Sequence, residues 1–251
     1  MTAFDDNAPG RQLVFDLSQR PSVSGEDFIV APCNATAVAW VDSWPDWPAP
    51  ALLVHGPDGC GKSHLASVWQ ARASALRLDL PWPGSFDPHQ ALGAAVAAVV
   101  EDVDHWIGQD GAQRQLLHLY NVVAERRGHL MLTSRQPPAG WPVGLADLRS
   151  RIAAAPSVAI ELPDEPMVAA LLVKLFADRQ LKVGDDVLGF LIARMDRSFD
   201  AARRLVAALD EAALLAQRNL TVPLAGEVLR EVGPDGQHDH AHHGHDHGHR
   251  G

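Results

Sequence analysis

A glycine-rich run near residue 60 restricts the folds open to this chain more than any other segment does. It reads Gly56-Pro57-Asp58-Gly59-Cys60-Gly61-Lys62-Ser63 and fills every fixed position of the pattern G-x-x-x-x-G-K-[ST]. Glycines let the backbone curve with its N–H groups pointing inward, and a helix that starts at the end of the loop favours an anion there. The run therefore predicts a phosphate-binding loop, in which Lys62 reaches the β- and γ-phosphates and the Ser63 hydroxyl ligates Mg²⁺.

The residues around this loop predict the strand and the helix that such a loop needs. Residues 51–55 form a short apolar run between Pro50 and Gly56, typical of a buried strand, and a helical pattern covers residues 62–75. Further strand-like runs alternate with helical stretches, the strands at 97–100, 130–133 and 158–162 and the helices at 113–126 and 145–154. This alternation predicts an α/β fold with a parallel sheet flanked by helices.

Strand signals stop after residue 162. Four amphipathic helical patterns follow, at residues 164–180, 185–195, 200–217 and 223–231. The sequence therefore predicts a flexible arm at 1–24, an α/β nucleotide-binding domain at 25–162, a small all-helical lid domain at 163–232 and a disordered tail at 233–251. The tail holds seven of the 13 histidines of the chain, but without fixed ligand spacing, so no metal site is assigned to it.

The charge balance and the apolar segments limit the environment of the chain. It carries 21 Lys and Arg against 31 Asp and Glu, a formal net charge of -10, so any contact with DNA is predicted to be local or indirect. No apolar stretch approaches the ~20 residues that span a bilayer. The two cysteines, Cys33 and Cys60, are too few for a disulfide framework. We therefore expect a soluble cytoplasmic protein that does not enter a membrane.

An acidic pair supplies the second part of a nucleotide site. Glu101 and Asp102 directly follow the apolar run at residues 97–100. One carboxylate at the end of such a strand can orient the water shell of Mg²⁺, and the other can polarise an attacking water. The sequence alone leaves open which of the two holds the metal together with Ser63.

The order of these motifs resembles the AAA+ ATPases, and more narrowly their DnaA/Hda branch, over about residues 11–232. Residues 28–34 are similar to the family's F-V-x-G-x-x-N box, which borders the adenine and here includes Val30 and Asn34, with Ala31 in place of the usual glycine. Glu101-Asp102 stands where the family has Asp-Asp or Asp-Asn, so strong hydrolysis by this chain is not expected. The resemblance implies ADP or ATP as a ligand, with Mg²⁺, bound by the phosphate loop and its neighbour His64.

Three further residues acquire expected roles from the resemblance. Leu132-Thr133-Ser134 matches the stretch that carries a polar sensor of the γ-phosphate, with Ser134 as the sensor and Arg135 where the family often has Asp. The segment Asp147-Leu148-Arg149-Ser150-Arg151 is similar to the arginine-finger box, with Arg151 at the finger position. In the lid, Arg203 aligns best with a second sensor arginine, although an offset of one residue would select Arg204 instead.

The resemblance also implies partners. Gln12, Leu13, Phe15 and Leu17 are similar to the short peptide by which many replication proteins dock on the sliding clamp, the β subunit of DNA polymerase. Beyond the lid, no DNA-reading domain is expected. The leading hypothesis is therefore a replisome-associated regulator of replication initiation that binds a nucleotide, docks on the clamp and presents Arg151 to ATP bound by DnaA.

Two other functions remain open at this point. A self-contained ATPase that remodels a partner or loads a helicase would use Glu101 or Asp102 for its own hydrolysis. A non-enzymatic anchor would depend on the N-terminal arm, so that Leu13→Ala abolishes function and Arg151→Ala does not. The sequence leaves the choice between ADP and ATP open, as well as self-association with the finger of one subunit in the site of another.

Overall fold

The computed structural model describes residues 19–20, 28–109, 111–216 and 219–232 of the 251-residue chain. The predicted clamp-binding peptide, Gln12 to Leu17, and the histidine-rich tail lie outside the described residues. None of the described helices is long and apolar enough to cross a membrane.

A five-stranded parallel sheet forms the centre of the first domain. Its order is β4-β5-β6-β3-β7, and every neighbouring pair is parallel. The strands are β3 (Ala51–His55), β4 (Leu76–Arg77), β5 (Ala97–Val100), β6 (His129–Ser134) and β7 (Ser157–Ala159). Because parallel strands end at the same edge, the segments that follow β3, β5 and β6 meet there. The predicted α/β class is confirmed.

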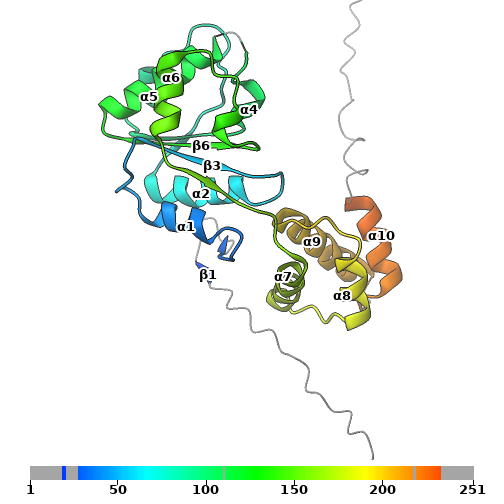
Figure 1. Cartoon of the computed structure of the whole chain (residues 1–251). Helices are drawn as coiled ribbons and strands as arrows, with labels where there is room; N and C mark the ends of the chain where they lie inside the picture. The colour runs from blue at the N-terminus through cyan, green and yellow to red at the C-terminus, as the bar shows by residue number, and fades with distance from the viewer. Residues whose placement is uncertain (1–18, 21–27, 110, 217–218, 233–251) are drawn as a thin grey trace, which may run out of the picture.

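Helices cover both faces of this sheet (Figure 1). On one face lie α1 (Ala35–Asp42) and α2 (Lys62–Ala73), which pack with the sheet around Trp69. On the other face lie α4 (Val103–Trp106), α5 (Ala112–Glu125) and α6 (Ala146–Ala154), which pack around Leu116 and Leu148. Burial on both sides explains why β5 is apolar at every position, since neither set of its side chains faces water.

Several short elements were not predicted from the sequence. They are the strand pair β1 (Gln19–Arg20) and β2 (Phe28–Ile29), the edge strand β4, helix α1, the five-residue helix α3 (Pro88–Leu92), the one-turn helix α4 and the 3-10 turn η1 (Pro138–Gly140). The predicted strand at 158–162 was wrong at its end: β7 stops at Ala159. Its partner β3 ends at His55, where the chain turns into the glycine-rich loop and offers no further strand to pair with.

The second domain is a bundle of four helices, as predicted (Figure 1). Asp164 caps the first of them, because its Oδ1 accepts a hydrogen bond from Met167 N at 2.9 Å. The helices are α7 (Glu165–Asp178), α8 (Asp185–Ile192), α9 (Phe199–Ala216) and α10 (Val222–Val232). Their apolar faces enclose a core of their own that includes Leu171, Phe176 and Leu205. The lid thus has a hydrophobic core of its own, which Ala31 of the α/β domain joins where the two domains meet.

A cluster of tryptophans packs where β6 begins. Trp47 stacks on Trp69 with ring centroids 5.2 Å apart, and His129 meets the rings of Trp44 and Trp47 edge-on, at 6.0 and 5.4 Å. Burial lowers the pKa of His129 below its ordinary value of 6.5. A proton on this imidazole therefore opposes folding.

Acidification should destabilise the protein through this cluster. The unfolded chain protonates His129 at a higher pH than the folded chain does, so stability is lost as the pH falls below about 6.5 toward the lowered folded pKa. Urea unfolding at pH 7.5, 6.5 and 5.5 measures the loss, and His129→Asn should reduce its slope. Burial also lowers the pKa of His55, so some slope should remain. An unchanged slope in His129→Asn would contradict the assignment.

Candidate nucleotide-binding site

The glycine-rich loop joins the end of β3 to the start of α2. Lys62 is the first residue of α2, and its Nζ donates hydrogen bonds to Gly56 O at 2.7 Å and Pro57 O at 2.9 Å. Its side chain is buried, so the ammonium group lies inside the loop that it closes. The backbone N–H groups of the first turn of α2 add partial positive charge beside it. These features are the ones that an anion such as a phosphate needs.

At two positions of the loop, neighbouring atoms lie so close to the backbone that only glycine fits. A Cβ at Gly56 would lie 2.1 Å from the carbonyl oxygen of Ile160, which follows β7. Gly59 has φ +73° and would place a Cβ 2.7 Å from the side chain of Ser198, in the turn before α9. The loop is therefore pressed against both the sheet and the lid, and no larger residue fits at either position.

The acids that follow β5 take different positions. The Ser63 hydroxyl donates to Glu101 Oε2 at 2.5 Å, and the Glu101 side chain is only 8% exposed. Asp102 turns the chain with φ +52°, and its N–H donates to Thr133 Oγ1 at 3.2 Å. A hydroxyl oxygen and a carboxylate oxygen side by side are the kind of ligands that Mg²⁺ takes. Of the two acids, Glu101 is thus the one beside Ser63, and the pair fits a magnesium ion.

Two arginines at this edge contact acidic residues of the site. Arg77, at the end of β4, places Nη1 3.0 Å from Glu101 Oε1. Arg135, after β6, places Nε 2.8 Å from Asp58 Oδ1 in the loop. Sequence reasoning noted Arg135 only as a departure from the family pattern and did not find Arg77, because the two-residue strand that carries it has no hydrophobic periodicity.

The turn after β6 is fixed by a third acid. The Asp104 carboxylate accepts hydrogen bonds from the backbone N–H groups of Arg135 and Gln136, at 3.1 and 3.2 Å. Ser134 is buried and donates its hydroxyl to Gln136 O at 2.7 Å. In this stretch the side chain that reaches the loop is therefore that of Arg135, while the sensor role of Ser134 stays a prediction.

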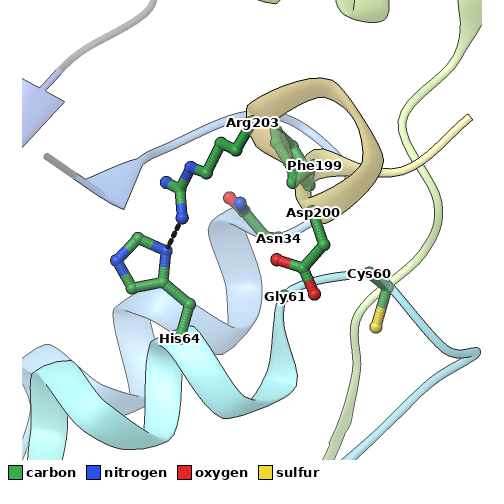
Figure 2. Close-up of a pocket in the computed structure, with 7 residues that line it drawn as sticks. All are labelled: Asn34, Cys60, Gly61, His64, Phe199, Asp200 and Arg203. Carbon is green, nitrogen blue, oxygen red and sulfur yellow. Dashed lines mark hydrogen bonds between the residues drawn. The ribbon is translucent and has the colours of Figure 1, made fainter. Parts of the chain in front are cut away.

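The lid closes over the start of α2 (Figure 2). Arg203 of α9 places Nη1 2.5 Å from His64 Nδ1 of α2, whereas the neighbouring Arg204 is exposed. The pocket at this junction is lined by Asn34, Cys60, Gly61, His64, Phe199, Asp200 and Arg203. Its volume of about 10 Å³ holds about one water molecule, so the junction in this arrangement has no room for a nucleotide base.

Residues of the predicted adenine border lie beside this junction. Asn34 is buried, and its Oδ1 accepts a hydrogen bond from Ala31 N at 2.8 Å, which fixes the turn before α1. Val30 is half-buried against the core around α1 and α2 and does not line the pocket. Burial raises the pKa of the Cys60 thiol, so this loop residue stays uncharged at neutral pH.

Arg151 lies apart from these residues. Its helix α6 covers the face of the sheet opposite α2 (Figure 1). The guanidinium carbon is 5.2 Å from the centroid of the Tyr120 ring, and Nε is buried without a hydrogen-bond partner among the described residues. Arg149 differs, because its Nε and Nη2 donate to Val143 O at 3.1 and 2.5 Å. The structure brings the loop, Glu101 and Arg203 together and leaves Arg151 outside.

The chain has the features of a P-loop AAA+ fold. These are a glycine-rich loop of the phosphate-binding pattern between a central parallel strand and a helix, an acid after the next strand but one, and a helical lid over the loop. Residues 164–229 match the family model described as the lid domain of Hda. Domain III of the Thermotoga maritima replication initiation protein DnaA has 18% sequence identity and a TM-score of 0.68, over 82% of this chain and 94% of that chain. The chain is therefore DnaA-like in its fold, and its helical domain matches the lid of Hda.

Other solved structures share the fold. DnaA from Aquifex aeolicus bound to AMPPCP is 17% identical, with a TM-score of 0.63 over 86% of this chain and 71% of that chain. The RuvB Holliday junction branch migration motor of Thermotoga maritima is 12% identical, with a TM-score of 0.52 over 72% of this chain and 61% of that chain. At these identities the likeness is one of fold.

Proposed function

We propose that this protein is a regulator of DNA replication initiation that stimulates hydrolysis of DnaA-bound ATP with Arg151 supplied in trans. The observation that carries the proposal is the position of Arg151 on α6, which covers the opposite face of the sheet from α2, the helix that follows the phosphate loop (Figure 1). Tyr120 supports its guanidinium carbon, and Nε has no hydrogen-bond partner in the described part of the chain. A cation placed in this way lies away from its own loop, so any action on a nucleotide would be on one held by another subunit or partner.

The chain itself binds ADP or ATP in this proposal. Lys62 and the loop N–H groups hold the phosphates, and Arg203 contacts them from the lid. Ser63 and Glu101 would hold Mg²⁺, which supplies positive charge to the phosphates when bound. ADP suits the proposal better than ATP, because the carboxylate that would hold Mg²⁺ for hydrolysis is already paired with Arg77. A nucleotide bound at the junction would hold α9 farther from the loop than it lies here and would stabilise that more open arrangement.

Contact with DNA is indirect in this proposal. The clamp-binding peptide of Gln12, Leu13, Phe15 and Leu17 would bring the protein to clamps loaded on DNA, while a net charge of -10 disfavours direct binding to the duplex. The protein would therefore be found in the cytoplasm at the replisome, next to its DnaA partner.

A second candidate is a self-contained ATPase. The hydrogen bond between Ser63 and Glu101 and the position of Arg203 favour it, because they give the chain the parts of a hydrolytic site. Self-association would then place Arg151 of one copy at the phosphate loop of the next. Turnover of ATP by the purified protein, rising with its concentration, would support this candidate over the first.

Hydrolysis of ATP preloaded on DnaA tests the proposed function. Radiolabelled ATP is bound to DnaA, and its conversion to ADP is followed with this protein, with DNA-loaded clamp, with both and with neither. We expect rapid conversion only when both are present. Conversion no faster than by DnaA alone in the complete mixture would overturn the proposal.

A further inference from the structure

The carboxylate of Glu101 is bound on both of its oxygens. Oε2 accepts the hydrogen bond from the Ser63 hydroxyl, and Oε1 lies 3.0 Å from Nη1 of Arg77. The Glu101 side chain is 8% exposed, so its charge is little screened by water. The acid that would stand beside the metal is thus already neutralised by a cation of the same chain.

The position of Arg77 makes this pairing a property of the sheet. β4 is the edge strand, and Arg77 pairs in register with Val99 of β5, two residues before Glu101. The other acid near Arg77 is Asp79, whose Oδ1 lies 4.0 Å from Nε and whose side chain is 97% exposed. That contact is weak, so the guanidinium is committed chiefly to Glu101.

The pairing of Arg77 with Glu101 reduces the negative charge beside the phosphate loop. A bare carboxylate beside Ser63 would repel bound phosphates, and in P-loop sites the charge of Mg²⁺ offsets such repulsion. Arg77 offsets part of this repulsion without a metal ion, although its own side chain is 53% exposed. Arg135 likewise pairs with Asp58 in the loop, which reduces the negative charge beside Lys62 and the loop N–H groups.

We propose that Arg77 is a built-in counter-charge that lets this site bind ADP with little dependence on Mg²⁺. It is a positioning residue that acts through Glu101. The inference rests on the proposed nucleotide binding, since Arg77 can have this effect only if the loop holds phosphates.

ADP titration of the full chain in two buffers tests the inference. Anisotropy of a fluorescent ADP analogue gives Kd with excess Mg²⁺ and with excess EDTA. For the wild type, we expect the two values to differ by about threefold or less. For Arg77→Ala, we expect Kd to change by less than about threefold in Mg²⁺ and to rise by about tenfold or more in EDTA, where nothing else offsets the Glu101 charge.

Two further variants separate charge from structure. Arg77→Lys keeps the positive charge and should recover most of the EDTA affinity that alanine loses. Arg114→Ala removes an exposed arginine from α5 and should leave both Kd values unchanged. Thermal unfolding of the ligand-free variants checks that each is folded.

Each outcome has a distinct meaning. Equal losses for Arg77→Ala in the two buffers, or a wild type whose affinity falls by far more than threefold in EDTA, would overturn the role of Arg77 and leave nucleotide binding in place. A wild type that binds ADP in neither buffer would overturn nucleotide binding at the loop, and this role with it.

Discussion

Arg151→Ala should abolish the stimulation of DnaA-bound ATP hydrolysis. An arginine finger supplied in trans contributes about 10³ to 10⁵ in rate, because it stabilises charge on the transferring phosphoryl group. No neighbour replaces it, since Arg149 is held by the carbonyl oxygen of Val143. The measurement is the single-turnover conversion of DnaA-bound ATP in the presence of clamp, DNA and the variant.

Two control variants sharpen this test. Arg151→Lys should restore little, because an ammonium group cannot bridge phosphate oxygens as the planar guanidinium does. Arg114→Ala, which removes an exposed arginine from the neighbouring helix α5, should leave stimulation intact. Arg151→Ala should still bind ADP normally, since α6 lies on the opposite face of the sheet from α2, the helix that follows the loop (Figure 1). Full stimulation by Arg151→Ala would exclude the finger and favour an anchoring role.

Lys62→Ala should weaken nucleotide binding on the order of 100-fold, a loss of about 2–3 kcal/mol expected when charge-assisted hydrogen bonds to phosphate are removed. Nζ lies inside the loop, bonded to the carbonyl oxygens of Gly56 and Pro57, and is placed to exchange these contacts for phosphate oxygens. Calorimetric titration with ADP measures the change. ADP should also raise the unfolding temperature of the wild type and leave that of Lys62→Ala nearly unchanged.

The matched control for Lys62 is Lys182→Ala, at an exposed position between α7 and α8. It removes the same charge from the chain without touching the loop, so its ADP affinity should equal that of the wild type. Wild-type affinity in Lys62→Ala would show that the nucleotide, if bound, is held elsewhere. A folding defect in Lys62→Ala would lower its unfolding temperature in the absence of ADP, which distinguishes it from a loss of ADP binding.

Much of the fold could be predicted because its signals are local. The strands at residues 51–55 and 97–100 are buried on both faces, so each reads as an unbroken apolar run, and β3 and β5 have these bounds in the structure. The lid helices could be predicted as well, because an amphipathic pattern is also a local signal. Short edge elements such as β4 carry too few residues for a pattern to show.

In the candidate site, too, the residues that are contiguous in sequence could be predicted, and those that meet only through the fold could not. The loop from Gly56 to Ser63 and the acids after residue 100 are contiguous, so the sequence alone could name them and the type of ligand they suit. Which acid stands beside Ser63 depended on the left-handed turn at Asp102, and which lid arginine meets His64 depended on the rotation of α9. Arg77 reaches Glu101 only because β4 and β5 are neighbours in the sheet. A site made of consecutive residues can be recognised from the sequence alone. Contacts between distant segments depend on strand order and helix packing, which exist only once the chain has folded.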